Sequence, residues 1–217
     1  MHYTLLHFPQ IRLPRRDGHK LRGYFANLFG KESDLFHNHQ ADGKVIYRYP
    51  RIQYKVVHGE PMLVGIAEGG KLLIERFLRI NEIDIDGLVF PVHQKNLKNE
   101  ECIIGVKNDL FQYEFVNPWL ALNEKKYPQY EAAANQTEKN DILKRILITN
   151  IINFLTAVDY RESERIMVSL DVRPLVVKFK NQQMVGFKGR FTTNAMLPDY
   201  VGFGKSVARG FGTIKKC

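Results

Sequence analysis

Four glycines stand within eleven residues near the C-terminus, in the stretch Gly202-Phe203-Gly204-Lys205-Ser206-Val207-Ala208-Arg209-Gly210-Phe211-Gly212. Because glycine has no Cβ, it accepts φ > 0 and lets other groups approach its backbone closely, so we expect this stretch to form a loop. Backbone N–H groups exposed in such turns create a concave anion site, and Lys205 and Arg209 add positive charge. The stretch therefore predicts a loop that binds phosphate.

Neither of two familiar nucleotide-binding motifs fits this loop. A P-loop ending at Gly204-Lys205-Ser206 would need its first glycine at Asp199, where a carboxylate would repel the phosphates. The dinucleotide fingerprint that starts at Gly202 has Val207 in place of its last glycine. The alternative to a phosphate site is a glycine-rich hairpin with solvated charges.

The charge of the chain favours a polymer of phosphates. The formal net charge is +9, and basic residues cluster both in the N-terminal segment and around the glycine-rich stretch. Two such clusters suit a polyanion such as a nucleic acid. With only Cys102 and Cys217, we expect neither a disulfide framework nor a metal knuckle, and we expect a reducing cytoplasm. No apolar run reaches the length of a membrane helix, and no signal peptide is recognisable.

The order of elements predicts the fold class. Along the first half, hydrophobic periodicity predicts a strand (3–13), a helix (15–29), two strands (45–57 and 61–67), a second helix over Leu72–Ile80 and a closing strand (83–92). This βαββαβ order is that of the ferredoxin-like fold.

The second half predicts a modified copy of the same arrangement. It has a strand (101–116), a long helix (137–157), two strands (165–180 and 183–193) and a short last strand after the glycine-rich stretch. Thr137 is the expected N-cap of that helix. Its expected buried face carries Ile142, Ile146, Ile151, Leu155 and Val158. We therefore expect an α+β protein of two tandem ferredoxin-like (RRM-like) domains, residues 1–98 and 99–217, with a C-terminal glycine-rich loop.

The second chemical signal is Phe36-His37-Asn38-His39, which follows the first helix. Two imidazoles in one loop can converge on one substrate atom, and histidine is the side chain best suited to proton transfer near neutral pH. Two solvated surface histidines are the ordinary alternative. A metal site would require further ligands, and no Cys/His/Asp cluster at ligand spacing supplies them, so acid–base chemistry ranks above metal binding.

Several motifs together resemble the CRISPR-associated RAMP superfamily, and in particular its endoribonucleases that process precursor CRISPR RNA within the repeats. The glycine-rich stretch resembles the signature of the superfamily, and the paired histidines resemble the branch that carries two. The other matching segments are Leu21–Tyr24, Tyr49–Lys55, Phe115–Trp119, Phe187–Phe191 and Asn194–Gly202. The resemblance covers most of the chain and implies two tandem ferredoxin-like domains.

The resemblance also implies the chemistry. Members of this family cleave RNA without metal: the ribose 2′-OH attacks the scissile phosphate and leaves a 2′,3′-cyclic phosphate and a 5′-OH. His37 and His39 are then the candidates for acid and base, without an assignment of which is which. Tyr47 or Lys31 would orient groups or stabilise the oxyanion.

Binding residues follow from the same resemblance. The glycine-rich loop, with Lys205 and Arg209, would hold the RNA backbone near the cut, and Lys188 and Arg190 would extend the track. The expected RNA-binding residues are Lys188, Arg190, Gly202, Gly204, Lys205, Ser206, Arg209 and Gly210. No metal and no cofactor are expected.

CRISPR repeat RNA is the implied partner, and the resemblance leaves open both a CRISPR effector complex and a homodimer. The main alternative function is a non-catalytic RAMP subunit that only binds guide RNA. A metal hydrolase built on His37 and His39 is a third hypothesis.

Overall fold

The computed structural model describes residues 1–36, 48–161, 164–179 and 182–217. Contacts divide the chain into two compact units. The N-terminal unit comprises Met1–Cys102 and Ala208–Gly210, and the C-terminal unit comprises Ile103–Val207 and Phe211–Cys217. The boundary expected from the sequence, between residues 98 and 99, falls inside a strand of the first unit. None of the described helices is long and apolar enough to cross a membrane.

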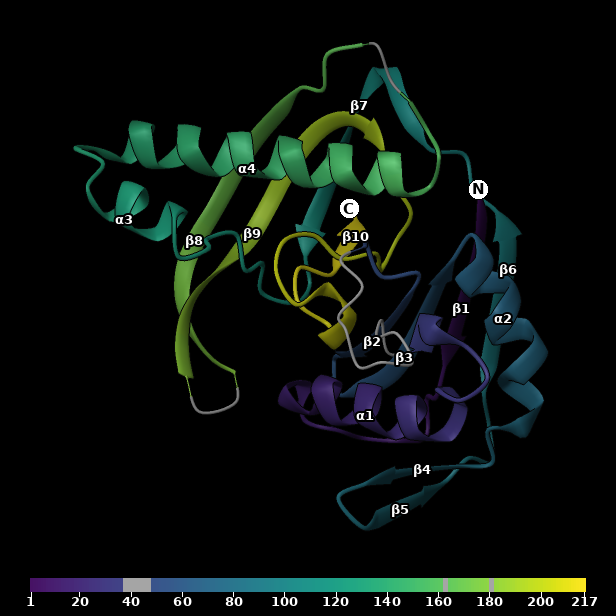
Figure 1. The fold of residues 1–217 in the computed structure, drawn as a ribbon. Coiled ribbons are helices and arrows are strands. Elements are labelled where there is room, and N and C mark those ends of the chain that lie inside the picture. Colours follow the sequence, from purple (N-terminus) through teal and green to yellow (C-terminus); the bar gives the residue numbers. More distant parts are fainter. Residues whose placement is uncertain (37–47, 162–163, 180–181) are drawn as a thin grey trace. The chain divides into compact units, whose positions relative to one another are not determined.

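The N-terminal unit has the strand order of a ferredoxin-like fold. Its sheet runs β2-β3-β1-β6, and neighbouring strands are antiparallel (Figure 1). The strands are β1 (His2–His7), β2 (Ile52–Val57), β3 (Glu60–Ile66) and β6 (Asn96–Glu101), and the helices are α1 (Gly18–Phe29) and α2 (Glu68–Arg76). The order β1-α1-β2-β3-α2-β6 is the expected βαββαβ.

The closing strand expected at 83–92 is wrong. That segment forms a separate hairpin of β4 (Glu82–Ile85) and β5 (Leu88–Pro91). Asp86 and Gly87 link these strands with φ of 56° and 86°, as a two-residue hairpin turn requires. The true closing strand, β6, has almost only exposed side chains, so it lacks the hydrophobic alternation that would have revealed it.

Aromatic packing joins α1 to its sheet. Leu21, Phe25 and Phe29 lie one turn apart along the helix and are buried. The Phe25 ring stacks on Tyr54 of β2 with a centroid distance of 5.8 Å, and Phe29 packs on Phe36 at 5.1 Å. This core fixes the start of the segment that carries the histidine pair.

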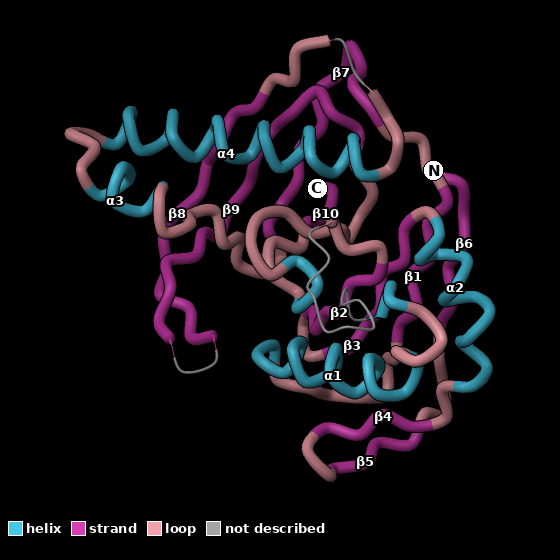
Figure 2. Tube along the Cα trace, in the orientation of Figure 1, coloured by secondary structure: helices cyan, strands magenta, loops and turns pink. Residues whose placement is uncertain are grey.

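The C-terminal unit repeats the strand order with different connections. Its sheet runs β10-β7-β9-β8. The strands are β7 (Gly105–Phe115), β8 (Val168–Phe179), β9 (Gln182–Met196) and β10 (Ile214–Lys216), and the helices are α3 (Lys126–Glu131) and α4 (Gln136–Ala157). Between β9 and β10, where the repeat would place its second helix, Figure 2 shows mostly loop, and the only helical piece is the short 3-10 turn Val207–Arg209.

Two details of α4 differ from the sequence expectation. Its N-cap is Asn135 rather than Thr137, because the Asn135 side chain accepts a hydrogen bond of 3.0 Å from the Glu138 N–H. Its buried face also differs. The side chains buried on α4 are Leu143, Leu147, Ile151, Phe154 and Leu155. Ile142 and Ile146 are only half-buried, so they lie beside this face and not in it.

Candidate nucleic-acid interface

The glycine-rich segment (residues 202–212) packs closely on its own unit at Gly204. A Cβ there would lie 2.6 Å from the Leu120 carbonyl oxygen and 2.8 Å from Nε1 of Trp119, and φ is 85°. The Lys205 N–H donates to the same Leu120 carbonyl at 2.9 Å. Glycine at 204 is therefore required by packing, and a side chain there would disturb the segment whether or not a ligand binds.

The backbone donors of the segment are already used in part. The Phe203 N–H donates to the Gly212 carbonyl at 3.0 Å, and the Gly212 N–H donates to Pro118 at 2.8 Å. Ser206 and Gly210 take left-handed conformations, with φ of 58° and 89°. Because several N–H groups already have protein acceptors, side-chain cations must carry more of any anion binding than the sequence motif suggested.

The two cations of the segment belong to different units. Lys205 is half-buried in the C-terminal unit, where it lines a cavity. Arg209 belongs to the N-terminal unit, and its carbonyl oxygen would lie 2.7 Å from a Cβ at Gly18, the first residue of α1. The structure therefore brings Arg209 to α1 within the N-terminal unit, and Lys205 to a cavity within the C-terminal unit.

Arg209 acts electrostatically on a second arginine, Arg22 of α1. Burial, and then the positive charge of Arg209, lower the pKa of Arg22. Two neighbouring guanidinium groups suit a phosphate, which arginine binds through paired N–H donors. Lys20, also on α1, is engaged with Asp17 at 3.2 Å and Asp86 at 2.7 Å, so its charge is offset. The Arg22–Arg209 pair is the strongest candidate anion site in this unit.

Three other expected cations have exposed side chains. Lys31 follows the C-cap of α1, at the end of the helix far from Gly18. Lys188 and Arg190 lie on β9. The register places Arg190 opposite Glu114 on one side and Asp171 on the other, which lowers the local positive potential. Lys188 lies opposite Arg173, so it adds to a basic stretch of the β8–β9 ribbon.

His37, His39 and Tyr47 lie outside the described residues, and the described residues on either side of them make polar contacts. The Tyr54 hydroxyl donates a hydrogen bond of 3.0 Å to the Phe36 carbonyl, directly before His37. At the other end, Arg48 forms an ion pair of 3.1 Å with Asp34. Because Asp34 precedes the segment and Arg48 follows it, the ion pair holds the two ends together.

The sequence motifs did not predict one buried cation. Lys55 on β2 is 0% exposed, and burial lowers its pKa to about 7. Its neighbour Tyr54 packs on α1, so strand alternation places Lys55 on the opposite face of the sheet. The sequence signal for this buried cation is a lysine in the middle of β2, a strand whose other side chains are all buried.

Comparison with known proteins places this geometry in a family. A solved structure of Cas6b is 35% identical, with a TM-score of 0.94, and the match covers 100% of this chain and 99% of that one. A second, a CRISPR RNA processing endoribonuclease Cas6b, is 32% identical, with a TM-score of 0.81 and 100% of both chains covered. An uncharacterised protein of Methanocaldococcus jannaschii is 34% identical over 141 residues, which are 64% of this chain and 95% of that protein.

Both halves of the chain also match family models, and the match extends through both ferredoxin-like units. The model for the Cas6b N-terminal domain matches residues 1–103, and the model for the Cas6b C-terminal domain matches residues 105–217. The chain therefore belongs to the Cas6b family.

Proposed function

We propose that this protein is a metal-independent endoribonuclease that cleaves precursor CRISPR RNA within its repeats. The observation that carries the proposal is the match to Cas6b along the whole chain, including a structure described as a CRISPR RNA processing endoribonuclease. The histidine pair and the Arg22–Arg209 pair supply residue types for acid–base work and phosphate binding.

The proposed reaction is an in-line attack by the ribose 2′-OH on the adjacent phosphate. One of His37 and His39 removes the 2′ proton, and the other protonates the leaving 5′ oxygen. Such proton transfer contributes about 10²–10⁴-fold to a rate. The products are a 2′,3′-cyclic phosphate and a 5′-OH, and no water or metal takes part in the step.

Charge on the phosphorane would be stabilised by cations and hydrogen-bond donors near the cut. Tyr47 or Lys31 is proposed for this role, because a fixed donor aimed at developing charge lowers the barrier. Arg22 and Arg209 are proposed to hold a phosphate of the strand. Lys205, Gly202, Gly204, Ser206 and Gly210 are proposed to line the path of the RNA, with Lys188 and Arg190 farther along it.

A 2′-deoxy substitution tests the mechanism. Wild-type protein is mixed, in excess EDTA, with repeat RNA that is unmodified or carries one 2′-deoxy nucleotide just upstream of the scissile phosphate. We expect the first RNA to be cut to a cyclic phosphate and the second to bind without being cut. A nuclease that uses a metal-activated water would cut neither RNA in EDTA and would cut both when Mg²⁺ replaces EDTA, so cutting of the deoxy substrate contradicts the proposal.

The same experiment separates the alternative function. A protein that binds both RNAs and cuts neither, in EDTA and in Mg²⁺ alike, is a guide-RNA-binding subunit of a CRISPR effector complex. The elution volume of the protein with and without RNA distinguishes a monomer from a homodimer. A cytoplasmic location fits the free cysteines Cys102 and Cys217.

A further inference from the structure

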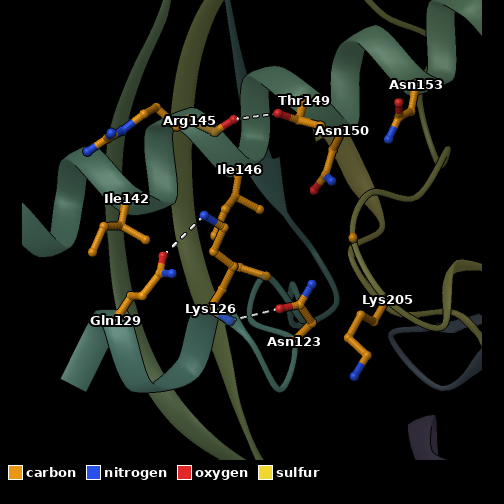
Figure 3. A pocket seen from close by; sticks show the side chains of 12 residues that line it. Asn123, Lys126, Gln129, Ile142, Arg145, Ile146, Thr149, Asn150, Asn153 and Lys205 are labelled. Atoms are coloured by element: carbon orange, nitrogen blue, oxygen red, sulfur yellow. Dashed lines mark hydrogen bonds between the residues drawn. The ribbon is translucent and has the colours of Figure 1, made fainter. Parts of the chain in front are cut away.

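A cavity of about 430 Å³ lies in the C-terminal unit, and of the residues named in the proposed function only Gly204 and Lys205 line it. Its walls come from α3, from α4 and from the glycine-rich segment (Figure 3). Sites for small ligands range from about 300 to 1,000 Å³, so one nucleotide fits the volume. What lines the cavity decides which ligand it suits.

The charged groups of the cavity are all positive. Lys126 comes from α3, Arg145 from α4 and Lys205 from the glycine-rich segment, and no carboxylate is among the described residues that line the cavity. Lys126 Nζ contacts the Gln129 amide oxygen at 3.1 Å, and Arg145 Nε donates to a backbone carbonyl at 3.2 Å. Because neither bond neutralises a cation, the cavity favours an anion such as a phosphate.

Side-chain amides supply the neutral donors and acceptors. The Asn150 Oδ1 accepts a hydrogen bond of 3.1 Å from Nε1 of Trp119, which leaves the NH₂ group of Asn150 as the donor toward the cavity. Asn153, one turn along α4, is exposed and lines the same cavity (Figure 3). Such amides pair with the polar edge of an unstacked base.

Two isoleucines form the apolar wall. Ile142 and Ile146 lie one turn apart on α4, half-buried, and their side chains point toward α3 (Figure 3). They stand beside the buried face of the helix, whose core side chains include Leu143 and Leu147. An apolar wall next to amides and cations suits the flat face of a base whose phosphate reaches the cations.

We propose that this cavity binds one unpaired nucleotide of the substrate RNA, other than the nucleotides that react. The phosphate lies near Lys126, Arg145 and Lys205, and the base lies against Ile142 and Ile146. A paired base has its polar edge occupied, so the cavity selects single-stranded RNA. This proposal rests on the proposed function, because it identifies the RNA substrate as the occupant.

A charge-matched pair of variants tests the site. Lys126→Ala/Arg145→Ala removes two cavity cations, and Lys125→Ala/Lys144→Ala removes two exposed cations next to them in sequence that do not line the cavity. The probe is full-length repeat RNA with a 2′-deoxy nucleotide at the cut. We expect the cavity variant to bind at least about fivefold more weakly than the control, with a salt slope lower by about 0.7 for one lost phosphate contact.

Cross-linking reports the base directly. Repeat RNA substituted with 4-thiouridine should cross-link to peptides of α3 or α4 in the wild-type protein and lose that product in the cavity variant. Equal affinities and salt slopes for cavity and control variants, or a cross-link confined to other segments, overturn the proposal. AMP and UMP are tested in parallel: if either binds the wild-type protein and not the cavity variant, while both proteins bind the RNA probe alike, the cavity belongs to a free nucleotide instead.

Cleavage keeps the two proposals apart. At saturating protein, the cavity variant should cut unmodified repeat RNA at the wild-type rate, because the cavity acts on binding and not on the chemical step. Wild-type protein that fails to cut contradicts the proposed function. Wild-type protein that cuts, together with a cavity variant that binds like its control, contradicts only the cavity proposal.

Discussion

The two units share one strand order but differ where each makes its second crossover. In the N-terminal unit, α2 (Glu68–Arg76) connects β3 to β6. In the C-terminal unit, the glycine-rich segment connects β9 to β10 with only the 3-10 turn Val207–Arg209. The same sheet thus carries a regular helix in one copy and an irregular, basic segment in the other.

The difference shows where each unit gains polar function. A helix uses its backbone N–H and C=O groups internally, whereas an irregular segment can place cations and donors at chosen points. The replaced crossover contributes Lys205 to a cavity beside α4 and sends Arg209 to α1. By contrast, the second crossover of the N-terminal unit is the regular helix α2, and the catalytic histidines that we propose for this unit come from the segment that follows α1.

The largest expected effect is on catalysis and would come from the N-terminal unit alone. His37→Ala/His39→Ala should lower the single-turnover cleavage rate by about 10²-fold or more, because proton transfer is lost, while RNA affinity changes little. His93→Ala, at an exposed histidine of the same unit, is the control and should cut normally. A double variant that cuts at the wild-type rate would remove the histidine pair from the mechanism.

The next expected effect is on the pH dependence of stability, and it comes from Lys55 in the sheet of the N-terminal unit. Burial lowers the pKa of Lys55 to about 7, so between that pH and its ordinary value the unfolded chain binds more protons than the folded one. Unfolding free energy therefore rises with pH in this window. Lys55→Met should remove this rise, so its stability relative to wild type should fall by up to about 1.4 kcal/mol per pH unit above pH 7.

The control substitution for Lys55→Met lies in the four-stranded sheet of the C-terminal unit. Lys188→Met, which replaces an exposed lysine of β9, is the matched control for the loss of one lysine from a strand. Urea denaturation at several pH values between 7 and 9.5 measures both variants. Parallel pH profiles for wild type and Lys55→Met would mean that Lys55 stays charged in the folded protein.

Sequence periodicity predicted the fold well where elements have one apolar face. Helix α1 was recognisable from Leu21, Phe25 and Phe29, with Gly30 after it. The closing strand β6 was missed because an exposed edge strand has no such face. In α4 apolar residues occupy more than one face, so the sequence placed Ile142 and Ile146 in the core, and the structure places them in a cavity wall.

The candidate site was predictable only in its local motifs. The glycine-rich stretch and the histidine pair are visible as residue types at short spacing. That Arg209 lies near Arg22 depends on contacts across nearly the whole chain length, which no local pattern encodes. The cavity lined by Lys126 and Arg145 likewise arises from helix packing.

A third expected effect is on the salt dependence of RNA binding, and it follows from the assignment of Lys205 and Arg209 to different units. Because Lys205 lines a cavity with α3 and α4 whereas Arg209 contacts α1, we expect Lys205→Ala and Arg209→Ala to act on different phosphates. Each should lower the salt slope of RNA binding by about 0.7, and the double variant by about 1.4, with about tenfold weaker binding at moderate salt. Fluorescence anisotropy at four salt concentrations measures the slopes. An unaltered slope in the double variant would mean that the segment is structural only.

The smallest expected effect compares one buried tyrosine hydroxyl in each unit. Tyr54 donates to the Phe36 carbonyl before His37, and Tyr113 of the C-terminal unit is bonded to Leu197, accepting from its N–H at 2.8 Å. A net hydrogen bond contributes about 1 kcal/mol, so Tyr54→Phe should slow cleavage at saturating protein by about fivefold through a less fixed histidine segment. Tyr113→Phe should lower Tm with no loss of that rate. Because both variants delete one buried hydroxyl, equal rate losses would indicate general destabilisation, whereas a loss confined to Tyr54→Phe identifies Tyr54 as a positioning residue for the histidine pair.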